Sequence, residues 1–370
     1  MDLKFILISP KNRTVYNFRG DLIKDIVKKR YEVIVTGPDN TDVEKITALG
    51  ATFKEIPMNK TGTSIVGDLK YLLKLFKLFK SEKPDVTLGY TVKPVAYGAI
   101  AAKLAGVKNI NSMVTGGGYT FTAKTTKAKI LGFVVRTLYK IGFYCADKVI
   151  FQNPDDLDEF CQRKLVKKEK CNVVNGSGVN MVHFMPEPPP ETVTFFMLSR
   201  LLKSKGVAEY LEAAKIVKEK YPEVRFCLLG KYETNMQDAL EREYVEGFIT
   251  DGIIERFEET SDVRPFYANC SVYVLPSYRE GTPRTVLEAM AMGKPIITTD
   301  TNGCRETVKD GVNGFLVPVG DSEKLSLAMM KFIENKDLIK TMGEESLVYA
   351  TEKFEVNQVN LQMLNILEMN

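Results

Sequence analysis

Two glutamates, Glu280 and Glu288, flank the start of a predicted helix with seven residues between them. A carboxylate only accepts hydrogen bonds, so each glutamate could hold two neighbouring hydroxyls of a ribose or a hexose. A helix start offers backbone N–H groups and positive potential, which favour phosphate. The alternative is an ordinary surface helix with two solvated glutamates, and a short motif alone does not decide between these interpretations.

Two cations, Arg200 and Lys205, occur in a second loop, which follows the predicted strand Val193–Leu198. Charged donors at a strand end could hold phosphates, since arginine and lysine both pair with phosphate oxygens. As exposed loop residues they could equally have no function. Their position matters because ligands of parallel α/β sheets bind outside the carboxyl ends of the strands.

The first half of the chain has a different chemical character. No Asp or Glu occurs between Val86 and Ala146, and this window contains the consecutive glycines Gly116, Gly117 and Gly118 after a predicted strand. Glycines at a strand end allow the backbone to approach an anion closely, although a flexible turn would look the same. Residues 1–180 hold 30 Lys and Arg against 17 Asp and Glu, whereas residues 181–370 hold 21 against 30. This asymmetry predicts an anionic partner for the first half.

Several classes of protein are disfavoured by composition. The six cysteines form no C-x-x-C pair and there is one histidine, which argues against a disulfide framework or a zinc site. No signal peptide is recognisable at the start, and no apolar run is long enough to cross a bilayer. We therefore expect a cytoplasmic protein, or one that rests on a membrane surface. The basic half contains no recognised nucleic-acid-binding module.

The elements that position these residues predict an α/β fold. Apolar strands alternate with helices in both halves, from Leu3–Ile8 and from Val193–Leu198 onward, which predicts two doubly wound, Rossmann-like domains with a cleft between them. The first βαβ unit lacks G-x-G-x-x-G, so a dinucleotide cofactor is not expected. Glycine turns and a proline cluster near 171–190 mark the connection, and we place the domains at residues 1–185 and 186–351.

One predicted helix, Asp68–Lys83, combines a stripe of lysines with a broad apolar face. Its apolar side is predicted to contain Leu69, Leu72, Leu73, Phe76 and Phe79. Such a helix could lie on anionic lipid headgroups. It could equally pack on the core as a surface helix with solvated lysines.

Taken together, these motifs resemble glycosyltransferase family 4. The resemblance rests on Arg200 with Lys205-Gly206, on Leu275-Pro-Ser-Tyr-Arg-Glu-Gly281 with Glu288, on Gly293-Lys-Pro-Ile-Ile297, and on Asp310-Gly-Val-Asn-Gly-Phe-Leu-Val-Pro318. It implies the GT-B fold, a retaining and metal-independent reaction without a cofactor, and a last helix, residues 352–370, that returns to the first domain. Tyr90-Thr-Val-Lys-Pro94 and Thr115-Gly-Gly-Gly-Tyr-Thr-Phe121 are similar to a bacterial subgroup that extends lipid-linked oligosaccharides for capsule, O-antigen or protein glycans.

The resemblance also implies roles for individual residues. Glu288 would hold the ribose hydroxyls, Glu280 the hydroxyls of the donor sugar, and Arg200 and Lys205 the leaving diphosphate. The remaining donor-binding residues would be Ser199, Gly281, Thr282 and Pro283, and the acceptor-binding residues Lys93, Gly116, Gly117 and Gly118. The expected donor is a UDP-sugar, often an N-acetylamino sugar. The expected acceptor is a polyprenyl-diphosphate-linked saccharide on the cytoplasmic face of the inner membrane, where the protein would be peripheral.

This chain departs from the family pattern in two places. No histidine precedes His183, so a histidine-assisted step in the first domain is not expected. Thr282-Pro283 replaces the apolar residue and second glycine of many members. Two rival functions of the same fold are a nucleotide-sugar epimerase, which would need acid–base groups in the cleft, and a sugar-nucleotide-binding protein that has lost catalysis.

Overall fold

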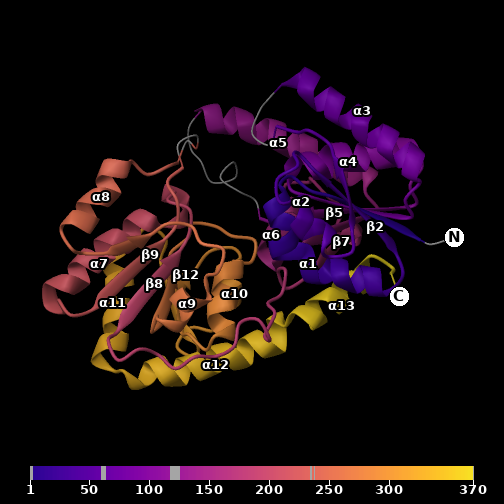
Figure 1. The fold of residues 1–370 in the computed structure, drawn as a ribbon. Coiled ribbons are helices and arrows are strands. Elements are labelled where there is room, and N and C mark those ends of the chain that lie inside the picture. The colour runs from indigo at the N-terminus through magenta and orange to yellow at the C-terminus, as the bar shows by residue number, and fades with distance from the viewer. Residues whose placement is uncertain (1–2, 60–63, 117–125, 234–235, 237, 370) are drawn as a thin grey trace. The chain divides into compact units, whose positions relative to one another are not determined.

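The chain folds into two α/β units in the computed structural model, which describes residues 3–59, 64–116, 126–233, 236 and 238–369 (Figure 1). One unit contains residues 1–177 and 357–370, and the other contains Gly178–Val356. The sequence predicted the two divisions after residues 185 and 351. Each unit is built on one parallel sheet with helices on both faces.

The sheet of the first unit has strand order β3-β2-β1-β4-β5-β6-β7, and every neighbouring pair is parallel. The order reverses between β1 and β4, which is the point where ligands of doubly wound folds bind. The strands are β1 (Lys4–Ile8), β2 (Glu32–Gly37), β3 (Thr52–Glu55), β4 (Val86–Tyr90), β5 (Asn109–Val114), β6 (Lys148–Phe151) and β7 (Cys171–Val173).

Helices cover both faces of this sheet because successive strand residues point to opposite sides. Phe5 and Leu7 of β1 pack with α1 and α13, whereas Ile6 and Ile8 pack with α3, α4 and α5 (Figure 1). The helices are α1 (Asn12–Lys28), α2 (Val43–Thr47), α3 (Ile65–Glu82), α4 (Val92–Ala105), α5 (Thr126–Cys145), α6 (Pro154–Gln162), the 3-10 helix η2 (Lys168–Lys170) and α13 (Val356–Ile366). Among the described residues, no helix has the length and apolar character needed to span a bilayer.

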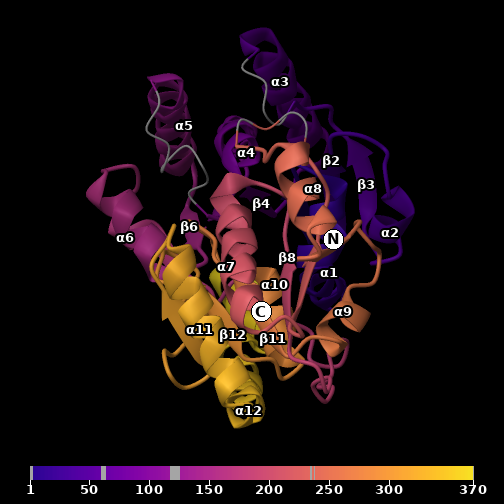
Figure 2. The same ribbon diagram turned by 90° about the vertical axis from the view of Figure 1, so that its left-hand side faces the viewer.

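The sheet of the second unit has strand order β10-β9-β8-β11-β12-β13 and is also parallel. Its strands are β8 (Thr194–Leu198), β9 (Arg225–Leu229), β10 (Glu255–Phe257), β11 (Val272–Leu275), β12 (Ile296–Thr299) and β13 (Gly314–Val317). Figure 2 shows α7 and α11 side by side on this unit. The other face carries α9, whose Phe266 stacks on Phe196 of β8 and whose Tyr267 meets Phe196 edge-on.

The helices of the second unit are α7 (Val207–Lys220), α8 (Arg242–Thr250), α9 (Arg264–Ala268), α10 (Arg284–Ala291), α11 (Ser322–Glu334) and α12 (Asp337–Phe354), with the 3-10 helices η3 (Lys203–Lys205) and η4 (Arg305–Thr307). The prediction that the last helix returns to the first unit is confirmed. Asn360 of α13 donates to Asp25 at 2.8 Å, and Met363 and Leu364 belong to the core of the first unit.

Two predicted helices differ in detail. An apolar stripe of Leu22, Ile23, Ile26 and Val27 predicts a helix from about Phe18 to Lys29. This helix, α1, begins at Asn12, because the buried Asn12 and Val15 extend its core-facing side beyond that stripe. In α3 the buried residues are Tyr71, Leu75 and Phe79, so α3 packs on the core. Leu69 and Leu73, predicted on the same side as Phe79, are half exposed at 53% and 50%.

Candidate active site

The site predicted in the second unit is built from the loops that follow β8 and β11, two neighbouring parallel strands. The loops contact each other through their backbones. Gly206 has a φ of +72°, and a Cβ atom there would lie 2.0 Å from the carbonyl oxygen of Pro276. The backbone N–H of Tyr278 donates to the carbonyl of Ser204 at 3.0 Å. Only glycine fits at this contact, and it fixes one loop against the other.

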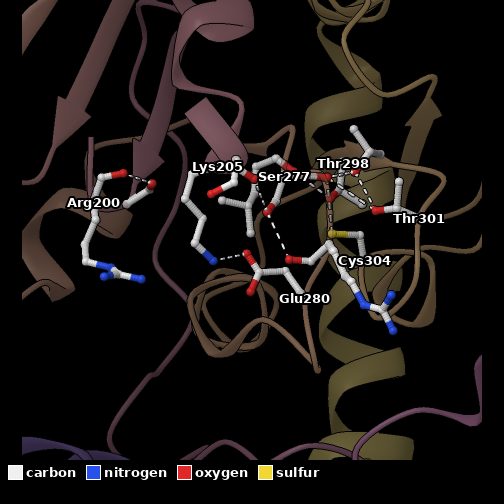
Figure 3. A network of polar contacts seen from close by, with 12 residues as sticks. Arg200, Lys205, Ser277, Glu280, Thr298, Thr301 and Cys304 are labelled. Atoms are coloured by element: carbon white, nitrogen blue, oxygen red, sulfur yellow. Dashed lines mark hydrogen bonds and ion pairs between the residues drawn. The ribbon is translucent and has the colours of Figure 1, made fainter. Parts of the chain in front are cut away.

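Lys205 and Glu280 form an ion pair across these two loops. The Lys205 Nζ atom lies 2.5 Å from Glu280 Oε1, and the two side chains are 23% and 15% exposed (Figure 3). The sequence assigned a phosphate role to one and a sugar role to the other without predicting that they touch. Their pairing places a cation and an acceptor at one point, where a phosphorylated sugar needs both.

Arg200 is more open than Lys205. Its side chain is 47% exposed, and its nearest carboxylate oxygen, on Glu233, lies 3.8 Å from Nη1. Figure 3 shows the Arg200 and Lys205 side chains pointing away from the strand ends in the same direction. The hydroxyl of Ser199 donates to the carbonyl of Arg200 at 2.7 Å, so this contact stabilises the loop locally.

A third loop, after β12, supports Glu280 and was not predicted as part of the site. The backbone N–H of Glu280 donates to the carbonyl of Asn302 at 3.1 Å. Gly303 has a φ of +76°, and a Cβ there would lie 2.2 Å from the carbonyl oxygen of Gly281. The sequence does show a glycine, Gly303, in a loop that follows a strand. It does not show which other loop Gly303 contacts.

The carbonyl of Ser277 collects hydrogen bonds from this third loop (Figure 3). Thr299 and Thr301 donate hydroxyls to it, and the Sγ atom of Cys304 lies 3.9 Å away. Burial, with Glu280 nearby as a further cause, raises the pKa of the Cys304 thiol to about 11, so the thiol remains protonated. These contacts fix the backbone just before Glu280.

Glu288 lies on the buried side of α10, with 13% of its side chain exposed. Its Oε1 accepts from Arg284 at 3.1 Å, and its Oε2 accepts from the hydroxyl of Tyr267 at 3.1 Å. Burial raises the pKa of the Glu288 carboxyl, and Arg284 and Tyr267 oppose that rise. Neither partner was predicted, although Arg284 stands four residues before Glu288, which is the spacing of helical neighbours.

Thr282 suits an N-cap, Pro283 the first helical position and Gly293 the position just past the helix end, so the sequence predicts a helix that begins at Pro283; α10 begins one residue later. Pro283, with an extended ψ of 109°, is the N-cap residue, and the helix begins at Arg284 instead of at Pro283 after a Thr282 cap. Thr282 is buried at 8% exposure. The helix end is confirmed, because Gly293 has a φ of +69° and its N–H donates to the carbonyl of Met290 at 3.0 Å.

The residues predicted for an acceptor lie in the first unit. Lys93 is 8% exposed, and its Nζ lies 2.5 Å from Asp68, which also accepts from Tyr97 at 3.0 Å. Gly116 follows β5 with a φ of +118°. Gly117 and Gly118 lie outside the described residues. Among the described residues no cluster of three or more His, Cys, Asp and Glu side chains could hold a metal ion.

The comparison with known families follows the division of the chain. Residues 183–347 match the model of the glycosyl transferases group 1, and residues 5–153 match a glycosyl transferase 4-like model. Together they cover more than four fifths of the 370 residues. These matches identify a glycosyl transferases group 1 domain and a glycosyl transferase 4-like domain in the chain. The predicted resemblance is confirmed and the protein is an enzyme, while the epimerase alternative receives no support.

Three bacterial relatives match with 28% identity. One is the N,N'-diacetylbacillosaminyl-diphospho-undecaprenol alpha-1,3-N-acetylgalactosaminyltransferase of Campylobacter jejuni, over 92% of this chain and 93% of the relative. Another is the capsular polysaccharide biosynthesis glycosyltransferase CapM of Staphylococcus aureus, over 93% and 94%. The third is the UDP-Gal:alpha-D-GlcNAc-diphosphoundecaprenol alpha-1,3-galactosyltransferase of Escherichia coli, over 76% and 75%.

The fold is that of the glycosyltransferase structures. The crystal structure of Anabaena HepE in complex with UDP and glucose superposes with a TM-score of 0.79 at 18% identity, covering all of both chains. The sucrose-phosphate synthase of Thermosynechococcus elongatus gives a TM-score of 0.82 at 18% identity, covering 99% of this chain and 98% of the other. The GT-B fold predicted from the sequence is therefore confirmed.

Proposed function

We propose that this glycosyltransferase moves a sugar, of the N-acetylamino class, from a UDP-sugar to a polyprenyl-diphosphate-linked saccharide during assembly of a bacterial surface polysaccharide or glycan. The donor-binding part of this proposal rests on the Lys205–Glu280 pair. Its two charged atoms lie 2.5 Å apart, in the loops that follow β8 and β11, in the unit matched by the group 1 model. The acceptor half is supported by the relatives, two of which are named for undecaprenyl-diphosphate-linked saccharides.

The chemistry proposed for this site is electrostatic. The bond between the anomeric carbon and the β-phosphate oxygen breaks, and Lys205 and Arg200 stabilise the negative charge that collects on the leaving diphosphate. Glu280 accepts hydrogen bonds from the donor sugar and Glu288 from the ribose. The Lys205–Glu280 contact would then orient the sugar relative to its leaving group, because one side chain touches each part.

The reaction would retain the configuration of the sugar without a nucleophile from the protein. The acceptor hydroxyl attacks the anomeric carbon from the side that the diphosphate leaves, and its proton passes to the departing phosphate oxygen. A double-displacement scheme would need two carboxyl groups flanking the bond, about 5 Å apart. Glu280 is engaged with Lys205, and Glu288 is buried between Arg284 and Tyr267, so neither is placed as a nucleophile.

Membrane attachment is part of the proposal, because a polyprenyl acceptor is confined to the bilayer. The outer surfaces of α3, α4 and α5, which lie side by side (Figure 1), combine exposed apolar residues with lysine and arginine. The exposed apolar residues are Ile65, Val66, Leu69, Leu73, Leu104, Leu131, Phe133, Val134, Ile141 and Tyr144. The two acidic residues of α3 are paired, Asp68 with Lys93 and Glu82 with Lys4. This composition suits anionic lipid headgroups.

The donor is tested by screening UDP-, GDP-, ADP- and TDP-sugars for thermal stabilisation and for hydrolysis. We expect UDP and UDP-N-acetylhexosamines to raise the unfolding temperature of the wild type, and Glu280→Gln to lower the rate of donor hydrolysis. Equal stabilisation by all four nucleotides would contradict the choice of donor. Unchanged hydrolysis in Glu280→Gln would contradict the site.

The membrane surface is tested by sedimentation with vesicles of phosphatidylglycerol and phosphatidylcholine. Binding should require the anionic lipid and should weaken as salt is raised, because exposed charges are screened. Leu73→Asp on α3 should reduce binding, whereas Leu327→Asp, on a residue 51% exposed on α11 of the second unit, should not. Binding that is insensitive to salt, or equal loss in both variants, would refute this surface.

A further inference from the structure

Protein groups hold both oxygens of the Glu288 carboxylate. Arg284 donates to Oε1 and Tyr267 to Oε2, each at 3.1 Å. A carboxylate has about four acceptor positions, so each oxygen can accept one further hydrogen bond from a ligand. The side chain is thus fixed in orientation but still able to bind a diol. Tyr267 is itself fully buried, and its single hydroxyl proton is shared between Glu288 Oε2 and the carbonyl of Thr285, 3.0 Å away.

Arg284 makes a second contact, on the other side of its guanidinium. Its Nη1 donates to the carbonyl of Gly178 at 2.7 Å, and only 12% of the Arg284 side chain is exposed. Gly178 has a φ of +67°, and a Cβ atom there would lie 2.8 Å from the Cα of Val356. The backbone N–H of Val179 donates to the carbonyl of Phe354 at 2.7 Å. The carbonyl that anchors Arg284 is therefore held where the first and last residues of the second unit meet.

We propose that Arg284 is a positioning residue for donor binding: anchored on the Gly178 carbonyl, it aims the Glu288 carboxylate at the ribose hydroxyls and keeps it ionised. The inference rests on the proposed function, in which Glu288 binds the ribose. Arg284 acts through Glu288 and does not itself contact the nucleotide. The anchor gives this role its precision, because a guanidinium held at both ends has little freedom to turn.

The charges around Glu288 give the proposal a measurable consequence. Three groups face this carboxyl: Arg284 on its own helix, Tyr267 on α9 and Tyr273 on β11. Burial raises the pKa values of both tyrosines far above the neutral range, so they remain uncharged, and Arg284 is the one cation among the three. Without its charge, burial would raise the pKa of Glu288 further. A protonated carboxyl offers fewer acceptor positions to a diol.

The test compares the binding of UDP with that of 2′,3′-dideoxy-UDP, which lacks both ribose hydroxyls, between pH 5 and 8. The wild type should prefer UDP by about 10- to 100-fold, the effect expected of hydrogen bonds to a buried charged group. In Arg284→Gln this preference should fall below about threefold. As the pH is lowered from 8 to 5, UDP binding to this variant should begin to weaken at a higher pH than binding to the wild type does. Arg284→Lys keeps the charge but cannot reach both partners, so it should retain the wild-type pH dependence with an intermediate preference.

A matched control exists on α8. Arg242 donates to Glu246 Oε1 at 3.3 Å, and the same oxygen accepts from the hydroxyl of Tyr232 at 3.0 Å, so the same three residue types meet at an exposed carboxylate. Arg242→Gln should leave both the preference for UDP and its pH dependence unchanged. A loss in this variant would mean that removing any such arginine disturbs the second unit, and would overturn the specific role of Arg284.

The possible negative results distinguish a failure of the proposed function from a failure of the inference about Arg284. If the wild type binds UDP and its dideoxy analogue equally, Glu288 does not bind the ribose, and both the proposed function of this residue and the inference fall. If the wild type prefers UDP and a folded Arg284→Gln prefers it equally, only the inference falls. If Arg284→Gln does not fold, Arg284→Lys decides, and a preference equal to that of the wild type overturns the positioning role.

Discussion

Replacing Lys205 by methionine removes one charge from the Lys205–Glu280 pair while keeping the length of the side chain. Two effects follow, and the structure separates them. Glu280, 15% exposed, loses the cation 2.5 Å from it, so the folded state is destabilised. If Lys205 also stabilises the leaving diphosphate, the transition state loses a charge-assisted contact. The first effect acts on the free protein and the second only during the reaction.

The magnitudes follow from the burial of the pair. Exposed ion pairs contribute about 0–1 kcal/mol, and breaking fully buried ones costs about 3–5 kcal/mol. This pair is 23% and 15% exposed, so we place the stability loss between these limits, at about 1–3 kcal/mol. A lost contact to developing charge costs about 3–4 kcal/mol of transition-state stabilisation, which lowers kcat by about 100- to 1000-fold. Because the charge develops in the reaction, kcat should change more than KM.

The assay is a double-mutant cycle of Lys205→Met and Glu280→Gln, read by urea unfolding and by steady-state transfer. Removing both charges leaves no uncompensated carboxylate, so the double variant should regain stability to within about 1 kcal/mol of the wild type while its kcat stays low. Lys203→Met, an exposed lysine in the same 3-10 turn, is the control and should change neither quantity. A kcat of Lys205→Met within about threefold of the wild type would refute the catalytic role.

Three further predictions concern the loops, the charges and the reaction. Gly303→Ala should lower the free energy of unfolding by at least about 3 kcal/mol, because its Cβ would meet the carbonyls of Glu280 and Gly281. Gly311→Ala is the control: Gly311 has a φ of +74° with open space around it, so this variant should lose only about 1–2 kcal/mol. Equal losses for the two variants in urea unfolding would contradict the close contact at Gly303. Arg264 lowers the pKa of Asp262 from 3.8 to about 2, so the Asp262 carboxylate stabilises the fold above pH 4 and this contribution is lost as the pH falls toward 2. The difference in unfolding free energy between the wild type and Asp262→Asn should therefore shrink between pH 4 and pH 2. A difference that stays constant over this interval would contradict the pairing. The transfer rate in the presence of EDTA should stay within about twofold of the untreated rate, because Arg200, Lys205 and the start of α10 supply the positive potential at the diphosphate. Loss of activity in EDTA that Mg²⁺ restores would refute a metal-independent reaction.

The sheet strands were predictable because parallel strands are buried on both faces and appear as continuous apolar runs. β11 (Val272–Leu275) is such a run, and all four of its residues are buried. The elements that the sequence did not predict are short or lack such a run. β3 (Thr52–Glu55) has no buried residue, and Val245 is the one buried residue in α8. Edge elements of this kind form because a neighbouring strand or helix is already in place, which local sequence does not record.

The candidate site was predictable as a set of residues but not as a set of contacts. Glu280, Glu288, Arg200 and Lys205 were predictable because their residue types and spacing match the pattern of glycosyltransferase family 4. The residues that contact them carry no comparable pattern in the sequence. Tyr267 contacts Glu288 across 21 residues of sequence, and Asn302 contacts Glu280 across 22. The first contact depends on how α9 meets α10 and the second on how the loop after β12 meets the loop after β11, which no periodicity in the sequence describes.

The backbone contacts between the loops explain how side chains on three separate loops could act as one site. A Cβ at Gly206, Gly230 or Gly303 would lie 1.8–2.2 Å from a carbonyl oxygen of a neighbouring loop, so each loop is fixed by main-chain packing. The charged side chains are therefore not needed to hold the loops together. Lys205 is paired with Glu280 in the free protein. In the proposed donor complex this contact is kept, with Lys205 on the diphosphate and Glu280 on the sugar hydroxyls. Because fixed groups need little reorganisation as charge develops, such an arrangement favours the transition state over the bound donor.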